Sequence, residues 1–292
     1  MIKVLITGSG SYIGTYFSEY INTNYQGEYI IDTVDMIGDS WRETDFSNYD
    51  CIFHVAGIAH SDSGKISPER EKLYYAVNTD LTIEVAKKAK ESGVKQFVFM
   101  SSAIVYGESA PIGKNKIITD KTPVNPSNCY GNSKVLAEKG LFELDDKNFK
   151  TVVLRPPMIY GKGCKGNYQL LTKIALKLPV FPYVANSRSM LYIENLCEFV
   201  RLVIKNEERG IFYPQNSEYT NTSYMVKKIA DSYNKKLYLV KGFSFVLKLL
   251  SFFIPLINKA FGSLCYDQNI SEYKTDYRKY SLDESIEKTV IK

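Results

Sequence analysis

Three side chains of kinds that support proton transfer follow one another in the middle of the chain: Ser102, Tyr130 and Lys134. Tyr130 and Lys134 are four residues apart in a helical segment, so they share one face of the helix. A free tyrosine has a pKa of about 10 and is a poor base at neutral pH. A lysine ammonium nearby would favour the tyrosinate, and Tyr130 could then exchange a proton with a substrate oxygen.

A Tyr-x-x-x-Lys pair is weak evidence by itself, because the chain contains 23 tyrosines and most such pairs are surface contacts. Ser102 alone would also suit a helix cap or a turn. The evidence for a site is stronger because all three residues occur, in this order, after a glycine-rich loop that can hold a dinucleotide. We therefore predict that Ser102, Tyr130 and Lys134 form one catalytic set.

The elements that must position these residues alternate between strands and helices. Short apolar runs predict strands at 2–7, 29–35, 51–57, 96–102 and 151–156. Helical spacing predicts helices at 12–21, 69–93 and 130–144. Buried strands alternating with helices imply a parallel sheet covered on both faces. The predicted fold class is α/β, a Rossmann-like doubly wound parallel sheet, and Ser102 would lie at a carboxyl strand end, where sites of such sheets are found.

After Pro156 the regular alternation of strands and helices gives way to short apolar runs and several prolines. The chain returns to a strand followed by a helix at 191–205 and then becomes mixed. We predict a dinucleotide-binding domain at 1–160, to which 188–210 returns. A smaller mixed C-terminal substrate domain would comprise 161–187 and 211–292.

The string ITGSGSYIG places Gly8, Gly10 and Gly14 between the first predicted strand and the first predicted helix. Glycines there permit a tight turn and a close approach to a pyrophosphate, whose charge the helix N-terminus favours. The spacing is one residue longer than G-x-G-x-x-G, but the flanking strand and helix favour a dinucleotide site. The predicted loop contacts are Gly8, Gly10, Ser11, Tyr12, Ile13 and Gly14.

Asp35 ends the second predicted strand, where an acidic residue would bind an adenosine ribose hydroxyl, and Asp32 is a competing candidate. No arginine follows directly to meet a 2′-phosphate, since Arg42 is seven residues on. The expected cofactor is NAD(H) or NADP(H). The absence of an arginine directly after Asp35 slightly favours NAD. A positively charged nicotinamide would add to the effect of Lys134 on Tyr130.

The composition argues against several other classes of protein. The net charge of +5 is mild and its basic residues are spread along the chain, so no nucleic-acid partner is expected. Five scattered cysteines without a C-x-x-C pair, and only two histidines, argue against a metal site and indicate reduced thiols. A cytoplasmic location is expected, because the N-terminus lacks the long apolar core of a signal peptide.

One segment, FSFVLKLLSFFIPLI at 243–257, raises the question of a membrane. Lys248 and Pro255 interrupt it, and a spanning helix needs roughly 20 mostly apolar residues. No integral membrane segment is therefore expected. We predict a buried or partly buried helix of the C-terminal domain, with a peripheral membrane contact as the alternative.

These motifs together resemble the extended short-chain dehydrogenase/reductases, the NAD-dependent epimerase/dehydratase family. The resemblance covers essentially the whole chain, through TGSGSYIG, HVAG, YYAVNTD, SSAIVYG, YGNSK, RPPMIYG and RSMLYIENL. It implies that Ser102, Tyr130 and Lys134 are catalytic and that Lys134 also contacts the nicotinamide ribose. It further implies that Ala56 and Gly57 line the nicotinamide path.

By the same resemblance, Asn78 would support the cofactor side of the site. The family's loop carries a glycine where this chain has Ser11, and we expect the loop to persist because serine is small. A homodimer through the helices at 69–92 and 130–144 is a family-level expectation.

The resemblance also narrows the reaction. The family's 4,6-dehydratases carry an Asp-Glu pair just before VYG, where this chain has Ala103 and Ile104, which cannot transfer a proton. Dehydratase chemistry is therefore not expected. A 4-ketoreductase and a 4-epimerase with tightly bound NAD use the same Ser-Tyr-Lys set, so the site leaves both open. Non-catalytic sensors of this fold typically lose the Tyr or the Lys, and both are present here.

The substrate side resembles the capsule and O-antigen branch of the family, through RPPMIYGKGCKGNYQLL, LPVFPYV, NSRSMLYIENL and AFGSL. Members of that branch reduce UDP-4-keto-6-deoxy-N-acetylhexosamines, so a UDP-sugar is the expected substrate. The residues that match Asn167 and Arg188 contact the nucleotide diphosphate in related members, and a guanidinium suits a bidentate phosphate contact. A second phosphate-binding arginine is missing, and Lys274 and Arg278 are the weak candidates for its place.

Overall fold

The computed structural model describes residues 1–58 and 66–290, and the chain divides into two compact units. Unit 1 comprises Met1–Gly107, Val124–Pro156 and Leu196–Pro214, and unit 2 comprises Glu108–Pro123, Pro157–Asn195 and Gln215–Lys292.

These units differ from the predicted domain boundaries because of two short pairs of strands. β5 (Ile117–Ile118) pairs with β12 (Cys265–Tyr266), and β7 (Met158–Tyr160) pairs with β9 (Met190–Tyr192). Both pairs join segments that lie far apart in the sequence. They hold residues 108–123, 157–160 and 188–195 in unit 2, whereas the sequence pattern assigned these residues to the first domain.

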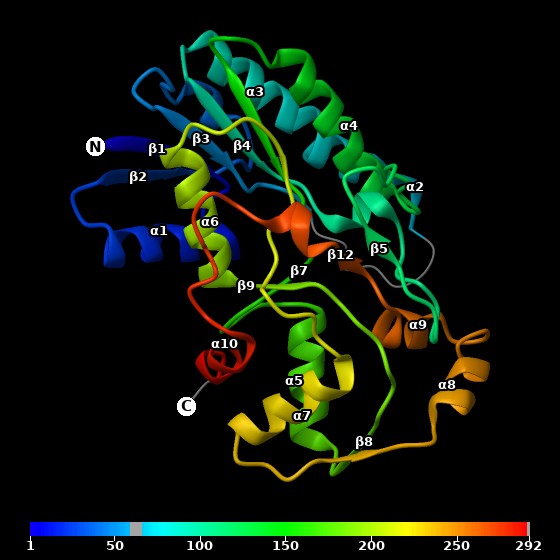
Figure 1. The fold of residues 1–292 in the computed structure, drawn as a ribbon. Helices are drawn as coiled ribbons and strands as arrows, with labels where there is room; N and C mark the ends of the chain where they lie inside the picture. The colour runs from blue at the N-terminus through cyan, green and yellow to red at the C-terminus, as the bar shows by residue number, and fades with distance from the viewer. Residues whose placement is uncertain (59–65, 291–292) are drawn as a thin grey trace. The chain divides into compact units, whose positions relative to one another are not determined.

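A six-stranded sheet forms the centre of unit 1, and all its neighbouring strands are parallel (Figure 1). The strand order is β10-β6-β4-β3-β1-β2. The bounds are β1 Ile2–Thr7, β2 Tyr29–Val34, β3 Cys51–His54, β4 Gln96–Met100, β6 Lys150–Leu154 and β10 Gly210–Phe212. The predicted doubly wound parallel sheet is confirmed, although β3 ends three residues earlier than its apolar run suggested.

Helices cover both faces of this sheet (Figure 1). On one face lie α1 (Tyr12–Asn24) and α6 (Ile193–Lys205), and on the other lie α3 (Leu81–Glu91) and α4 (Cys129–Leu144). The core on the α3 and α4 side is made of fully buried apolar side chains from the sheet and both helices: Leu5, Ile52, Phe97, Val153, Val85, Ala89, Ala137 and Leu141. This packing fixes α4, which carries two of the predicted catalytic residues.

The long helix predicted at 69–93 is interrupted. It begins with α2 (Pro68–Tyr75), capped by Ser67, and continues through a π-helical turn at Ala76–Asp80 into α3. A π turn inserts an extra residue into a helix and is frequent at functional sites. Asn78 lies in this turn and is completely buried.

The order in which the chain adds strands to the sheet reverses between β1 and β3. From β1 the chain runs outward to β2 at the edge of the sheet, and then crosses back to β3 on the other side of β1. Ligands of open α/β sheets bind beyond the carboxyl ends of the strands at such a reversal. The segments that leave β1 and β3 touch there, since the Val55 and Ala56 amides both donate to the Thr7 carbonyl, at 3.1 and 2.9 Å.

Unit 2 contains three parallel pairs of strands, the third formed by β8 (Val180–Pro182) and β11 (Tyr238–Val240). Its longer helices, α5 (Asn167–Lys177) and α7 (Thr222–Ser232), pack side by side. The C-terminal helix α10 (Leu282–Lys288) begins at a capping box, in which Ser281 and Glu284 satisfy each other's backbone amides.

The apolar segment at 243–257 forms two short helices, α8 (Ser244–Leu250) and α9 (Pro255–Phe261). Pro255 begins the second helix, where its missing N–H costs nothing. The prediction of a buried or partly buried helix is wrong for most of α8, which has no buried residue and in which only Leu247 is partly buried. Phe245 within it is 70% exposed and Phe253 behind it is 85% exposed. Within 1–58 and 66–290, no helix is long and apolar enough to cross a membrane.

Candidate active site

Two elements of unit 1 bring the predicted catalytic side chains together. Ser102 follows β4, and its hydroxyl accepts a hydrogen bond from the Ile104 amide at 3.3 Å. Tyr130 and Lys134 lie one turn apart near the start of α4, whose N-cap is Asn128. The side chains of Tyr130 and Ser102 form a hydrogen bond, so both hydroxyls lie at one place.

The surroundings of Tyr130 favour its protonated form. Burial is the largest influence and raises the pKa of Tyr130, and nearby Tyr74, whose ring centroid is 6.0 Å away, raises it further. The hydrogen bond with Ser102 lowers the pKa, but by less than burial raises it. The groups of the protein alone therefore favour the neutral phenol, whereas the sequence suggested a shift towards the tyrosinate.

Lys134 is almost completely buried, at 5% exposure. Its ammonium donates to the Met100 carbonyl at 2.9 Å and lies 4.6 Å from the centroid of the Phe99 ring. Burial lowers the pKa of Lys134 to about 8, against the opposing effect of the Glu138 carboxylate. An ammonium has three donors, and the Met100 carbonyl uses one of them. The others are available for a ribose hydroxyl.

Glu138, which sequence reasoning did not single out, lies one turn after Lys134 on the same face of α4. It accepts hydrogen bonds from the Ser101 hydroxyl and from the guanidinium of Arg155, at 3.1 Å to Nε and 2.5 Å to Nη2. Arg155 also donates to the Tyr106 hydroxyl at 2.7 Å. This cluster ties α4 to the ends of β4 and β6. Its position four residues after Lys134, on the same helix face, was the sequence feature that could have identified Glu138.

The glycine loop forms a tight cradle at the end of β1. Gly8 has a φ of +117°, and a Cβ there would stand 2.8 Å from the Ala56 amide nitrogen. A Cβ on Gly14 would stand 2.7 Å from the Ser11 hydroxyl and 3.0 Å from the Ile6 side chain. These two positions therefore exclude a side chain, and the start of α1 is held close to β1.

Ser11 has a role of its own in this loop. Its hydroxyl accepts from the Gly14 amide at 3.2 Å and caps α1, with a φ of −68° that requires no glycine. The serine that replaces the family's middle glycine is thus compatible with the turn. Tyr12 and Ile13 form the first turn of α1, directly behind the cradle, and the φ of Gly10 is +70°.

The predicted nicotinamide side is assembled from three segments. A Cβ on Gly57 would lie 3.0 Å from Asn78 Oδ1 and 3.3 Å from Lys134 Nζ, so this glycine admits two polar side chains. Asn78 is fixed by a donated and an accepted bond with the Ile58 backbone, at 3.1 and 2.8 Å, and it donates to Ser133 at 3.2 Å. Ala56 lies against Gly8.

The structure separates the two acidic candidates for the adenosine ribose. Asp32 lies within β2 and accepts from the Tyr49 hydroxyl at 3.0 Å. Asp35 directly follows β2 at the edge where Gly8 donates to the Val34 carbonyl. Within residues 1–58 and 66–290 it accepts only a local bond, from the Ile37 amide. Arg42 is held by Glu84 and Asp39. These positions favour Asp35.

The donors and the glycine cradle of unit 1 fit a nicotinamide dinucleotide. The N-terminus of α1 would meet the pyrophosphate, Asp35 the adenosine ribose, and Lys134 the nicotinamide ribose. Gly8, Gly14 and Gly57 leave space where a side chain would block the approach.

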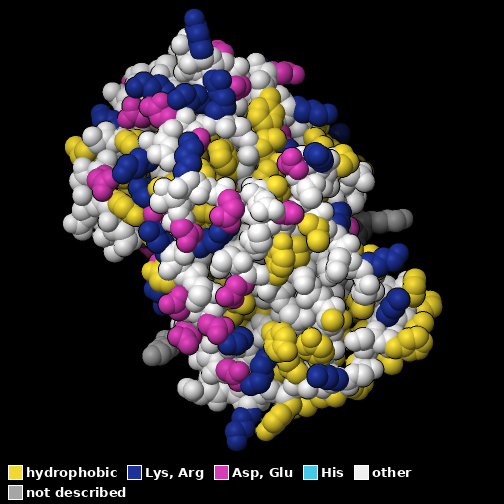
Figure 2. Space-filling view, in the orientation of Figure 1, with side chains coloured by type: hydrophobic (Ala, Val, Ile, Leu, Met, Phe, Trp, Pro, Cys, Tyr) yellow, Lys and Arg dark blue, Asp and Glu magenta, His cyan; other side chains and the backbone are white. Residues whose placement is uncertain are grey.

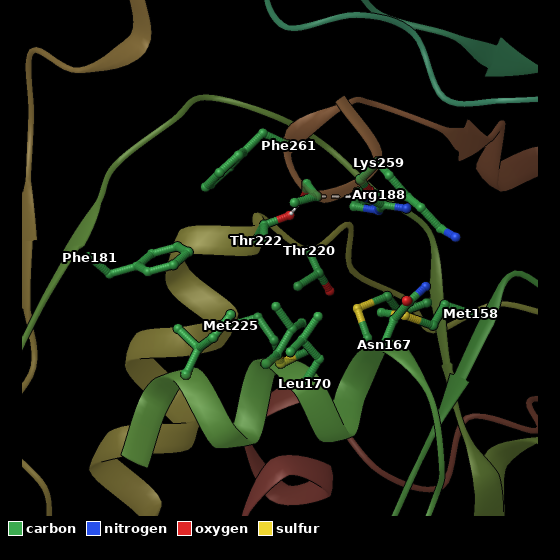
Figure 3. A pocket seen from close by; sticks show the side chains of 14 residues that line it. Met158, Asn167, Leu170, Phe181, Arg188, Thr220, Thr222, Met225, Lys259 and Phe261 are labelled. Atoms are coloured by element: carbon green, nitrogen blue, oxygen red, sulfur yellow. Dashed lines mark hydrogen bonds between the residues drawn. The ribbon is translucent and has the colours of Figure 1, made fainter. Parts of the chain in front are cut away.

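Unit 2 contains a cavity of about 160 Å³ lined by both predicted substrate residues, Asn167 and Arg188 (Figure 3). Figure 3 shows these two with Lys259 on one side of the cavity, and Phe181 and Met225 on the other. The remaining lining residues are Met158, Leu170, Leu171, Ile174, Met190, Thr220, Thr222, Ala260 and Phe261. The cavity therefore has a polar side and an apolar side.

Arg188 carries a positive charge that no carboxylate of the described chain pairs with. Its guanidinium donates to the carbonyls of Lys259 and Ala260, at 2.7 and 3.3 Å. Burial lowers the pKa of Arg188, which indicates that water solvates this charge poorly. A partly buried charge of this kind is stabilised by an anion.

Lys259 is the second cation of the cavity, and sequence reasoning missed it. It lies in α9, directly before the AFGSL motif, and lines the cavity together with Arg188. The candidates predicted from the sequence do not line it. Arg278 pairs instead with Glu272 at 3.0 Å and donates to the Gln215 carbonyl at 3.2 Å.

Comparisons with known proteins identify the family of the chain. A model of the NAD dependent epimerase/dehydratase family matches residues 4–214. UDP-glucose 4-epimerase from Vibrio cholerae is 31% identical over 257 residues, which cover 80% of this chain and 76% of that protein. The N-acetyl-alpha-D-glucosaminyl-diphospho-ditrans,octacis-undecaprenol 4-epimerase from Escherichia coli O157:H7 is 30% identical over 254 residues, covering 80% and 73%.

Solved structures show the same fold at lower identity. UDP-glucuronic acid 4-epimerase from Bacillus cereus, in complex with NAD, superposes with a TM-score of 0.74 at 16% identity and covers 99% of this chain and 95% of its own. A dTDP-4-dehydrorhamnose reductase from Clostridium acetobutylicum gives 0.73 at 16% identity, with 99% and 98% covered. With the family model matching most of the chain, the protein belongs to the NAD-dependent epimerase/dehydratase family and is an enzyme of that kind.

Proposed function

We propose that this enzyme reduces the C4 keto group of a UDP-4-keto-6-deoxy-N-acetylhexosamine with NAD(P)H, in the cytoplasm, as a step in making surface-polysaccharide precursors. The observation that carries the proposal is the hydrogen-bonded pair of Ser102 and Tyr130, with the pKa of Tyr130 raised by burial. Reduction of a ketone needs a proton donor, and a neutral phenol is one.

The residues of the chain would act on the keto oxygen. A reduced nicotinamide, when bound, would supply a hydride for C4. Tyr130 donates its proton to the oxygen, and Ser102 donates a hydrogen bond to the same atom, which stabilises the charge that develops there. The ammonium of Lys134, one turn away, stabilises the tyrosinate that remains until solvent returns the proton.

Elimination of water is not supported by the residues present. The positions just before VYG hold Ala103, which is buried, and Ile104. Neither side chain can give or take a proton, so a 4,6-dehydratase would lack its acid and base.

The cavity of unit 2 supports a nucleoside diphosphate as the carrier of the sugar. Arg188 and Lys259 supply two positive charges, and Asn167 supplies an amide beside them. Two cations suit the two negative charges of a diphosphate ester. The apolar side of the cavity would bury flat or aliphatic parts of the ligand.

A 4-epimerase is the second candidate, favoured by the names of the two relatives at 30% and 31% identity. An epimerase oxidises C4 and then returns the hydride to the opposite face. It would therefore hold its cofactor through the reaction and need no net supply of reduced coenzyme.

The experiment that separates the two offers purified enzyme a UDP-4-keto-6-deoxy-N-acetylhexosamine with NADH or NADPH. We expect one reduced coenzyme to be oxidised per product, measured by nicotinamide absorbance, with the sugar nucleotides followed by chromatography. We also expect no interconversion of UDP-N-acetylglucosamine and UDP-N-acetylgalactosamine. Efficient interconversion without net coenzyme change would replace the reductase by the epimerase.

A further inference from the structure

The segment around α8 exposes a continuous run of large apolar side chains, which we name the α8 surface. None of the residues of α8 is buried, so the helix presents apolar groups to solvent on more than one side. A helix that is apolar all round normally lies in a core or in lipid. The members of the α8 surface exposed by more than a third are Phe243, Phe245, Val246, Leu249, Leu250, Phe252, Phe253 and Ile254.

Strands of the same unit add to this surface. Tyr238 and Val240 of β11 are exposed, as is Val180 of β8, with which β11 pairs. Figure 2 shows hydrophobic side chains, interspersed with Lys and Arg, over α8 and along the edge where β8 and β11 run. Single exposed apolar residues are ordinary, but a patch gathered from one helix and two strands marks an interaction site.

The segment that carries the α8 surface has charges of one sign. Between Asp231 and Asp267 the chain contains five lysines and no acidic residue. The lysines stand at 235, 236, 241, 248 and 259, so they flank the apolar side chains on both sides of α8. A partner that covers this surface should therefore offer an apolar interior and a negatively charged border.

We propose that the α8 surface docks onto the interfacial region of a lipid bilayer that contains anionic phospholipids. Phenylalanine and leucine side chains would enter the boundary between headgroups and acyl chains, and the lysines would meet the headgroup phosphates. Lys248, in the middle of α8, can extend its charged end to the phosphates while its methylene groups stay among the apolar side chains.

The length of α8 agrees with lying on the membrane and not with crossing it. Its seven residues span about 10 Å at 1.5 Å per residue, against about 30 Å for the hydrocarbon core. The chain then continues into α9, which carries Lys259 and Phe261 into the cavity of unit 2. Docking would thus hold the cavity-lining helix next to the bilayer. This inference does not depend on which sugar the enzyme uses.

The test measures flotation of the full-length protein with vesicles. We expect it to bind vesicles of equal parts phosphatidylglycerol and phosphatidylcholine, and to bind phosphatidylcholine alone at least about tenfold more weakly. The double variants Phe252→Ser/Phe253→Ser and Lys241→Glu/Lys248→Glu should each lower binding to the anionic vesicles by at least about tenfold.

Two matched variants control for general effects on the surface. Ile37→Ser removes an apolar side chain that is equally exposed in unit 1, and Lys87→Glu reverses a charge on α3. Both should bind like the wild type, and all the variants should keep wild-type turnover of a water-soluble substrate. Lost turnover with retained flotation would therefore bear on the proposed function and not on docking.

Three results would overturn the proposal. The first is no flotation with either vesicle, and the second is equal flotation of the wild type and both double variants. The third is a concentration-dependent dimer that Phe252→Ser/Phe253→Ser converts to monomer, because a second copy of the chain would then cover the α8 surface.

Discussion

Glu138 and Arg155 form a buried ion pair in which the carboxylate lies one helical turn from Lys134. The side chains are 4% and 8% exposed, and two hydrogen bonds join them. Because Glu138 shares its helix face with Lys134 and raises the pKa of that ammonium, the pair acts on the site through Lys134. We therefore infer that Glu138 is a positioning residue, because its hydrogen bonds go to Ser101 and Arg155 and its effect on the site passes through Lys134.

Replacing one member of this pair should destabilise the fold strongly. Arg155→Met leaves the Glu138 carboxylate buried and unpaired, which typically costs about 3–5 kcal/mol. Urea unfolding should show this loss, and the double variant Glu138→Met/Arg155→Met should recover most of it. Lys150→Met, which breaks the solvent-exposed pair with Glu207, should cost at most about 1 kcal/mol. Equal losses for the buried and the exposed pair would contradict this account.

The buried ammonium of Lys134 should make stability depend on pH. Its pKa in the folded protein is about 8, below that of an unfolded lysine. Between these values the unfolded chain binds the extra proton, so the free energy of unfolding should rise with pH by up to about 3 kcal/mol. Denaturant unfolding of wild type and Lys134→Met at pH 7 and pH 10 isolates the effect as a difference. A difference that stays constant would show that the ammonium is not buried.

Removing the Tyr130 hydroxyl should stop the chemistry and spare the cofactor. Tyr130→Phe deletes the proton donor, and general acid–base catalysis typically contributes about 10²–10⁴-fold. We expect turnover to fall by that factor while coenzyme affinity, measured by fluorescence titration, stays the same. Tyr75→Phe, on the helix that precedes the π turn, is the matched control and should keep wild-type turnover. Wild-type turnover in Tyr130→Phe would remove the residue from the mechanism.

The parts of the fold that repeat a local pattern could be predicted. Five of the six strands of unit 1 were found because each is a short apolar run, and the glycine loop because it stands between a strand and a helix. The sixth, β10, was not predicted, because its three residues are only partly buried. The π turn at 76–80 was not predicted, since one inserted residue shifts the apolar spacing by a single position, and the irregular apolar spacing of an ordinary helix hides such a shift. The two-residue strands β5 and β12 depend on partners far along the chain.

In the site, too, residues in local motifs could be predicted and residues brought together only by the fold could not. Ser102, Tyr130 and Lys134 stand in recognisable strings, whereas Lys259 is one lysine among many until the cavity places it beside Arg188. The exposure of α8 was missed for a related reason. An apolar run reports that side chains avoid water, but not whether protein or another apolar phase covers them.

Adding a methyl group to the glycine cradle should abolish cofactor binding. Gly8→Ala combines a φ of +117° with a Cβ only 2.8 Å from the Ala56 amide, so either the loop or the segment after β3 must move. Gly93→Ala is the matched control, with a φ of +81° and open space around the new Cβ. Calorimetry with NADH and NADPH should show lost binding for the first variant only. Unchanged affinity in Gly8→Ala would mean that the dinucleotide does not use this loop.

The two cations of the unit 2 cavity should act on the diphosphate alone. Arg188→Ala should weaken UDP binding by about 1.5–3 kcal/mol, the range for a hydrogen bond to a charged group, and Lys259→Ala by less because its ammonium is exposed to water. Calorimetry with UDP and with uridine separates the contributions, since uridine lacks the charges and should bind both variants like the wild type. Lys173→Ala, on α5 but outside the cavity lining, should change neither affinity. If UDP and uridine weakened equally, Arg188 would be shaping the cavity and the phosphates would lie elsewhere.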